Sequence, residues 1–132
     1  KIARRLSEMR PLDRAPLNVL LQVNLQGENT KSGVDPATLE NLAREVAGFP
    51  NIQLRGLMAI PEPEQVFNMQ RQIFGALRTM QSLLNKKGFD LDVLSMGMTG
   101  DMRAAIAEGA THVRVGTAIF GPRAYPDTSP AR

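Results

Sequence analysis

The sequence contains no cysteine and only one histidine, His112. Disulfide-stapled secreted folds, thiolate metal sites and cysteine nucleophiles are therefore excluded, as are metal clusters built from several histidines. No apolar run approaches the roughly 20 residues that a membrane-spanning helix needs. The basic start of the chain has no apolar segment behind it, so it does not resemble a signal peptide. These absences predict a cytoplasmic protein without a membrane partner.

Aromatic residues are also scarce, with one tyrosine and no tryptophan among 132 residues. The chain carries a net charge of +3 and a pI near 9.8, a balance that is common in nucleic-acid-binding proteins. Here the basic residues are interspersed with acidic ones, and few rings are present to stack on bases. We therefore expect no nucleic-acid partner and only a weak attraction for anions.

Strand-like and helical segments alternate along the chain. The expected strands are residues 17–25, 53–60, 91–94 and 112–115. Between them, apolar residues recur at helical spacing, most clearly from Val66 to Leu84. This alternation predicts an α/β fold with a parallel sheet. Four βα units make half of a TIM-type (β/α)₈ barrel, which usually needs about 250 residues.

The two ends of the chain are expected to differ from these units. Residues 1–11 have the pattern of the last turns of a helix, closed by Pro11. Residues 122–132 are rich in proline and serine and are expected to form a flexible tail. Because a domain rarely begins with the end of a helix, we expect a missing upstream segment, which makes residues 1–132 the C-terminal half of a barrel.

The first strand alternates between two kinds of residue. Leucine or valine occupies every odd position from Leu17 to Leu25, whereas the even positions include Asn18, Gln22 and Asn24. The apolar face is expected to pack on helices and the other face to line the barrel lumen. Asn24, at the C-terminal end of the strand, is then well placed to touch a ligand.

Two loops that directly follow strands combine glycines with hydroxyls, at 95–101 and 116–118. Small residues let backbone N–H groups approach a ligand, and a helix start adds unpaired N–H groups. Phosphate sites in (β/α)₈ barrels are often built from the loops after strands seven and eight. Thr99 or Asp101 capping a helix, with the glycines as turn residues, explains the spacing equally well, so both interpretations stay open.

Arg114 alternates with two valines, so its guanidinium is expected to enter the lumen, where it needs an acceptor. That acceptor is either a carboxylate of the protein, in a structural ion pair, or a ligand atom. His112 is expected to be a satisfied rim residue and Lys31 a solvated loop cation. The carboxylates of residues 62–64 are expected at a helix N-terminus, which favours negative charge.

Four ordered motifs resemble a known family. They are Asn24 with Glu28-Asn29-Thr30-Lys31-Ser32-Gly33, Arg55-Gly56-Leu57-Met58-Ala59-Ile60-Pro61, Leu94-Ser95-Met96-Gly97-Met98, and Val113-Arg114-Val115-Gly116-Thr117-Ala118-Ile119-Phe120-Gly121. In sequence and order they are similar to the pyridoxal phosphate homeostasis proteins, from about Leu17 to Tyr125. That family resembles the barrel domain of bacterial alanine racemase in fold.

The resemblance implies pyridoxal 5'-phosphate (PLP) as the cofactor and assigns residues to it. The implied phosphate site is built from Ser95, Gly97, Met98, Thr99, Gly116 and Thr117. Arg114 is implied to face the pyridine nitrogen, where a cation disfavours protonation and weakens the ring as an electron sink. Asn24 and Met58 are implied to line the ring pocket. Family members are regarded as non-catalytic carriers or regulators of vitamin B6 and amino-acid balance.

Two departures from the family pattern matter. Thr99-Gly100 stands where the family usually has serine followed by an acidic residue, and threonine keeps the hydroxyl. The family's Schiff-base lysine lies on the first barrel strand, and no segment here corresponds to it. The four lysines of the chain are Lys1, Lys31, Lys86 and Lys87, none of them in such a strand.

Two other functions remain open. An enzyme of the alanine racemase type needs two acid/base groups, usually lysine and tyrosine, and the only tyrosine is Tyr125 in the tail. A general phosphate-binding barrel would take a sugar or nucleotide phosphate instead of PLP. Because an isolated half barrel leaves sheet edges open, we also expect self-association or pairing with the missing N-terminal half.

Overall fold

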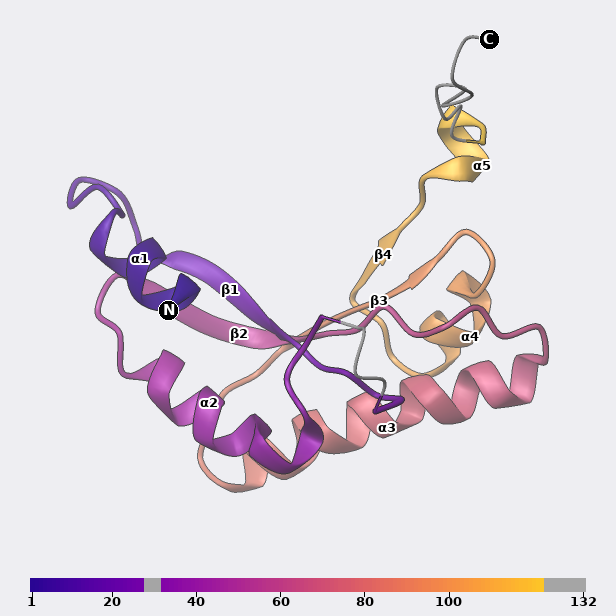
Figure 1. The fold of residues 1–132 in the computed structure, drawn as a ribbon, viewed down its shortest axis with the longest axis horizontal. Coiled ribbons are helices and arrows are strands. Elements are labelled where there is room, and N and C mark those ends of the chain that lie inside the picture. The colour runs from indigo at the N-terminus through magenta and orange to yellow at the C-terminus, as the bar shows by residue number, and fades with distance from the viewer. Residues whose placement is uncertain (28–31, 123–132) are drawn as a thin grey trace, which may run out of the picture.

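The computed structural model describes residues 1–27 and 32–122 of the chain. The elements are α1 (Ile2–Glu8), β1 (Leu17–Gln22), the 3₁₀ turn η1 (Pro36–Thr38), α2 (Leu39–Ala47), β2 (Ile52–Met58), α3 (Phe67–Lys86), β3 (Val93–Met98), α4 (Met102–Ala107), β4 (His112–Arg114) and α5 (Thr117–Phe120). The strands are parallel and lie in the order β1-β2-β3-β4 (Figure 1). The predicted α/β fold with a parallel sheet is confirmed.

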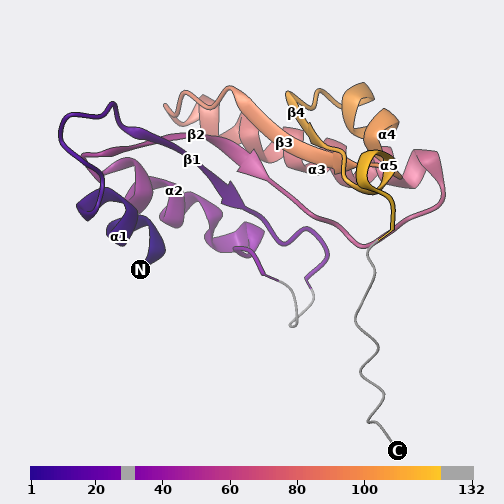
Figure 2. The ribbon, with the colours of Figure 1, turned by 90° about the horizontal axis from the view of Figure 1, so that it is seen from above.

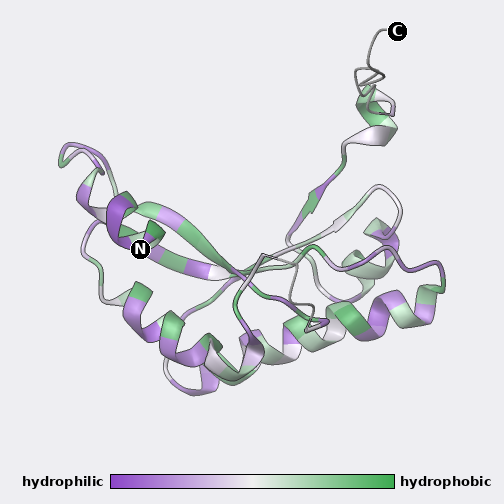
Figure 3. Cartoon of the chain, in the orientation of Figure 1, coloured by the Kyte–Doolittle hydropathy of each residue, from purple (hydrophilic) through white to green (hydrophobic). Residues whose placement is uncertain are grey.

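The long helices pack along one face of this sheet. Figure 2 shows β1 and β4 at opposite edges, with α1 and α2 beside the β1 half and α3 and α4 beside the β4 half. Helix α3 is amphipathic and buries Phe74, Leu77 and Leu84, and hydrophilic and hydrophobic residues alternate along it in Figure 3. These side chains meet buried strand residues such as Leu57 and Met96, which form the centre of the core.

The two faces predicted for the first strand are found in the structure. Leu21 and Val23 are buried in the core, and Leu17 and Val19 pack against it. On the other face, Asn18 is exposed and Gln22 is half-buried. The alternation in the sequence therefore identified the face that packs on the helices.

Strands β2 and β3 approach each other unusually closely at Gly56. A Cβ added there would lie 1.8 Å from the carbonyl oxygen of Val93, so only glycine fits. One residue earlier, the register of β1 and β2 skips Arg55. Its guanidinium instead makes a two-pronged ion pair with Asp92, with Nε–Oδ1 at 2.7 Å and Nη2–Oδ2 at 2.5 Å.

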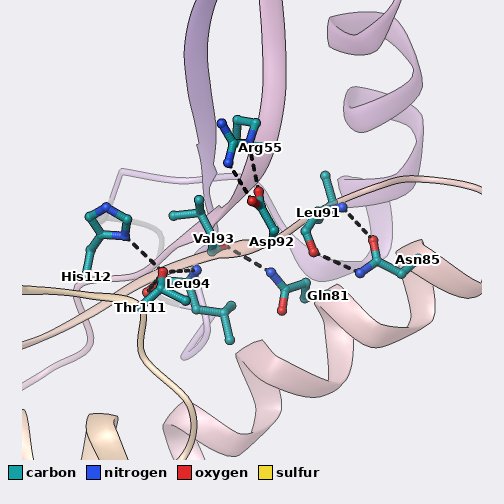
Figure 4. Close-up of polar contacts among 9 residues, drawn as sticks. All are labelled: Arg55, Gln81, Asn85, Leu91, Asp92, Val93, Leu94, Thr111 and His112. Carbon is teal, nitrogen blue, oxygen red and sulfur yellow. Dashed lines mark hydrogen bonds and ion pairs between the residues drawn. The ribbon is translucent and has the colours of Figure 1, made fainter.

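Side chains from α3 hold the start of β3 in place (Figure 4). The amide of Asn85 donates to the carbonyl of Leu91 at 2.9 Å and accepts from its N–H at 2.8 Å. Gln81 donates to the carbonyl oxygen of Val93 at 3.1 Å. These bonds tie the backbone of Leu91 and Val93 to α3 and so fix how β3 enters the sheet.

The bounds of all four strands differ from those predicted; β2 covers Ile52–Met58 instead of 53–60, and β4 ends at Arg114 instead of residue 115. Residues 91–94 were expected to form the third strand, but β3 begins at Val93 and runs to Met98, whose backbone pairs with Arg114. Strand β1 ends at Gln22 instead of residue 25, and Val23 makes only an isolated bridge. Helix α4 begins at Met102. The tail from residue 123 and Lys31 lie outside the described residues.

Within the described part of the chain, no helix combines the length and the apolar character needed to cross a membrane.

Candidate functional site

The loops after β3 and β4 meet at one end of the sheet, as the sequence predicted. The hydroxyl of Thr117 donates to that of Thr99 at 3.3 Å. Between the two loops lies a hollow of about 320 Å³, lined by Met98, Thr99, Gly100, Gly116, Thr117, Phe120 and Gly121. Four of the residues implied to hold the phosphate, Met98, Thr99, Gly116 and Thr117, are therefore brought together.

The β3–α4 loop is shaped by a reciprocal turn. The backbone N–H of Met98 donates to Asp101 Oδ1 at 2.6 Å, and the N–H of Asp101 returns to the carbonyl of Met98 at 3.3 Å. Asp101 is the N-cap residue of α4, but its side chain makes no capping bond to that helix. The carboxylate is therefore used to close the loop.

Gly97 is required for packing between β3 and α4. Its φ is +95°, and an added Cβ would lie 2.5 Å from the Cβ of Ala105. The residue is buried and does not line the hollow. Its structural task is to let α4 lie close enough to the strand to present the loop; a contact between Gly97 and a cofactor stays a prediction.

The other side of the hollow is the start of α5. The N–H groups of Ile119 and Phe120 donate to the carbonyl of Gly116 at 2.9 Å each. Because the first N–H groups of a helix have no partner within it, Thr117 and Ala118 offer donors at this end. A Cβ added to Gly116 would meet nothing within 4 Å, so the backbone there is open to a ligand.

A second group of predicted residues lies on the lumen face of the sheet. Met58 and Ser95 are register partners in neighbouring strands, so their side chains share this face. Ser95 is buried, and its hydroxyl accepts a 2.6 Å hydrogen bond from Arg114 Nη1. Ser95 is thus the partner of Arg114 and is not among the residues lining the hollow between the loops.

The acceptors of Arg114 within the protein are not the carboxylate that the sequence allowed, and its contact with a ligand atom stays a prediction. Nη1 donates to the carbonyl and hydroxyl oxygens of Ser95 at 3.0 and 2.6 Å, and Nη2 donates to the carbonyl of Ala59 at 2.9 Å. Within residues 1–27 and 32–122, no carboxylate forms an ion pair with it. The charge is held by neutral oxygens of β2 and β3, which fix the guanidinium across the lumen face.

Asn24 closes the turn that follows β1. Its Oδ1 accepts from the backbone N–H groups of Gln26 and Gly27 at 3.3 and 3.1 Å. The returning chain passes very close, since a Cβ on Gly33 would lie 2.8 Å from the backbone nitrogen of Asn24. The side chain is half-buried at the C-terminal end of β1, and its contact with a ring stays a prediction.

Charged groups away from the hollow have structural partners. Glu64 Oε1 accepts from the backbone N–H groups of Gln65 and Val66, which precede α3. Helix α3 begins at Phe67 and has no acidic residue in its first turn, so residues 62–64 lie just ahead of the helix N-terminus instead of forming it. His112 Nδ1 lies 2.9 Å from the hydroxyl of Thr111. Lys87 forms an ion pair with Glu40, and this pairing, together with Arg44, holds the pKa of Glu40 below its usual value.

Sequence reasoning missed three contributors to this end of the sheet. Phe120 and Gly121 line the hollow, and the sequence signal was their position directly after the predicted loop. Gln70 is buried on α3, where its side chain donates to backbone carbonyls of two loops. The sequence feature that could have identified Gln70 is its place as a polar residue within the apolar stripe of the helix.

Comparison with known proteins adds to this geometry. The family model described as "Alanine racemase, N-terminal domain" matches residues 1–124. The pyridoxal phosphate homeostasis protein of Pseudomonas aeruginosa is 55% identical over 125 residues, which cover 95% of this chain and 53% of that protein. The Vibrio cholerae protein of the same name is 52% identical with the same coverage.

Among solved structures, PipY of Synechococcus elongatus with PLP bound superposes with a TM-score of 0.80 at 36% identity. The match covers 91% of this chain and 56% of PipY. The chain thus spans about half the length of the relatives it matches. The resemblance seen in the four motifs is confirmed, the sheet is half of a barrel, and the chain belongs to the family of the alanine racemase N-terminal domain.

Proposed function

We propose that this chain binds PLP by its phosphate end, in the hollow between the β3–α4 loop and α5. The single observation that carries the proposal is the meeting of Thr99 and Thr117 across that hollow, with Gly100 and Gly116 beside them. PipY, which has PLP bound, is similar over most of this chain.

The groups that line the hollow fit a phosphate. Two hydroxyls and the first N–H groups of α5 supply donors, and neither Gly100 nor Gly116 would obstruct an anion, since an added Cβ on either meets nothing within 4 Å. The nearby carboxylate of Asp101 already accepts from the N–H of Met98. Donors therefore dominate the lining.

The lumen face would hold the ring. Arg114, fixed by Ser95 and Ala59, is the cation there, and Met58 lies on the same face next to Ser95. When bound, PLP supplies an aldehyde and an electron-accepting ring. This chain's residues position the cofactor: the loops hold its phosphate, and Arg114 places a fixed positive charge beside the ring.

We assign the chain a non-catalytic role in PLP and amino-acid homeostasis. Racemisation needs two acid/base groups that flank the reacting carbon. The residues lining the hollow include neither lysine nor tyrosine in the part of the chain that the structure describes. Among the described lysines, Lys87 is paired with Glu40 at the far end of α3, and Lys86 is in the last turn of that helix.

Binding to PLP and competition by inorganic phosphate test the proposal. PLP is expected to bind reversibly, and phosphate to displace it. Replacing both hydroxyls, in Thr99→Val with Thr117→Val, should weaken PLP binding by about a hundredfold or more, since each hydrogen bond to a charged group contributes about 1.5–3 kcal/mol net and about 1.4 kcal/mol is a factor of ten. Thr79→Val is the matched control, because Thr79 bonds only within α3. PLP binding that phosphate does not displace would contradict the proposal.

A general phosphate-binding role is the second candidate. It is favoured by one observation: the hollow itself offers donors suited to any phosphate, while the ring contacts lie on the separate lumen face. Equal affinity for PLP and for a sugar phosphate would support this second function, whereas a marked preference for PLP supports the first.

We also propose that the chain associates through its open sheet, with a second copy or with a complementary barrel half. In the described residues, β1 and β4 each pair along one side only. Near β4, the apolar side chains of Ile119 and Phe120 are 67% and 86% exposed. Neighbouring large apolar residues with this much exposure are typical of surfaces that contact another molecule. Pairing at these edges would cover both the strand edges and this area.

A further inference from the structure

Hydrogen bonds from side chains link the loops that follow all four strands. Gln26, after β1, accepts from the N–H of Glu62, after β2, at 2.6 Å. Gln70 then connects the loop after β2 to the loop after β3, and Thr117 connects the loop after β4 back to Thr99. The loops at this end of the sheet are thus tied to one another in sequence order.

Gln70 is the buried member of this set. The residue is 8% exposed, and its Nε2 donates to the carbonyl of Glu64 at 2.7 Å and, in a longer bond, to the carbonyl of Gly100 at 3.5 Å. Only an amide group can give two hydrogens from one nitrogen without adding charge. Burying such a group in an apolar helix face is costly unless both hydrogens are used.

The position of Gln70 on α3 makes its polarity informative. The buried residues of this helix are Gln70, Phe74, Leu77 and Leu84, a stripe that is otherwise apolar. A leucine at position 70 would suit that stripe. A glutamine there is explained by the two loop carbonyls that it contacts.

Gln70 and Met98 together fix one peptide of the β3–α4 loop. The carbonyl of Gly100 accepts from Gln70, and the N–H of Asp101, the other end of the same planar peptide, donates to the carbonyl of Met98 at 3.3 Å. Glycine at position 100 has wide backbone freedom, so without a contact this peptide would rotate. Holding it at both ends sets the orientation of Thr99 and Gly100 in the lining of the hollow.

We propose that Gln70 is a positioning residue that preorganises the β3–α4 loop for the phosphate of the ligand. The inference rests on the proposed function for its ligand, but the positioning of the loop can be measured without one. Ordering a loop before binding improves affinity because the ligand no longer has to order it. The effect should therefore be specific to ligands that carry the phosphate.

The test compares Gln70→Met with Gln72→Met in the 132-residue chain. Methionine keeps the length of the side chain but removes the donors, and Gln72 is an exposed residue two positions along the same helix. Gln70→Met should weaken PLP about five- to tenfold and leave pyridoxal, which lacks the phosphate, within twofold of the wild type. Gln72→Met should change neither. An equal loss for PLP and pyridoxal, or no loss for PLP, would overturn the inference.

Two further measurements separate this inference from the proposed function. In the ligand-free protein, the backbone amide of Asp101 should exchange with solvent faster in Gln70→Met than in Gln72→Met; equal exchange overturns the positioning role even if neither protein binds PLP. If Gln70→Met fails to fold, the side-chain amide resonance of Gln70 in the wild type decides. It should shift on addition of inorganic phosphate and not of pyridoxal, and an unmoved resonance in a chain that binds phosphate would contradict the inference.

Discussion

Replacing Gly97 by alanine should destabilise the sheet where β3 meets α4. The φ of +95° at this position disfavours any residue with a Cβ, by about 1–2 kcal/mol. The new Cβ would also lie 2.5 Å from the Cβ of Ala105, well inside the normal contact distance of about 3.5–4.0 Å. Overpacking of this kind costs about 1–3 kcal/mol, so the free energy of unfolding should fall by about 2–5 kcal/mol in all.

Urea unfolding followed by circular dichroism measures this loss. With a slope of about 1–3 kcal/mol per molar urea, the midpoint should fall by about 1–2 M or more. Gly100→Ala is the matched control, because an added Cβ there meets nothing within 4 Å and its φ is not left-handed. A Gly97→Ala protein within about 0.5 kcal/mol of the wild type would refute the reasoning, since that is the usual range for substitutions without a packing cost.

Three more predictions follow from the ion pairs and the open sheet. Glu108, with 6% of its side chain exposed, accepts from two arginines of α3, so Glu108→Gln should lower the free energy of unfolding by about 1–2 kcal/mol. The control Glu45→Gln changes an exposed residue of α2 and should leave that free energy unchanged; equal thermal melts for the two variants would contradict the prediction. The Arg55 guanidinium holds the pKa of Asp92 below its usual value, so its stabilisation is present at neutral pH and is lost as the pH falls through the folded-state pKa. The difference in urea midpoint between wild type and Asp92→Asn should therefore be seen at pH 7 and shrink below about pH 4, whereas a difference independent of pH would rule out this linkage. Light scattering should give a mass above that of one chain, or show a shift when a complementary barrel half is added, and a compact stable monomer that ignores that half would argue against association.

Much of the fold follows from local sequence patterns. The odd-even alternation of the first strand identified its buried face, and the helical stripe ending at Leu84 identified α3. The meeting of Thr99 and Thr117 was also predictable, because the C-terminal ends of parallel strands lie at one edge of a sheet. These features depend on periodicity and strand direction, which a single sequence contains.

What the sequence could not supply depends on close approaches in space. Ser95 and Gly97 are residue types common in loops, yet both lie in β3. At Gly97 the absence of a Cβ lets α4 pack against the strand, which the sequence alone does not show. Two of the acceptors of Arg114 are backbone carbonyls. Every residue has a backbone carbonyl, so the residue types in the sequence do not indicate which ones will accept. From the sequence, Gln70 could be recognised only as a polar residue within an apolar helical stripe. Its two hydrogen-bond acceptors could not be predicted, because they lie in loops 6 and 30 residues away along the chain.

The central claim is that this chain holds the phosphate of PLP without a covalent anchor of its own. The most direct measurement is to mix the chain with PLP, reduce the mixture with borohydride, and map any adduct by mass spectrometry, with phosphate competition run in parallel. The account predicts reversible binding that phosphate displaces and no stoichiometric adduct on any of the four lysines. A single stoichiometric adduct, on Lys31 for example, would contradict it and show that this half of the barrel anchors the cofactor covalently.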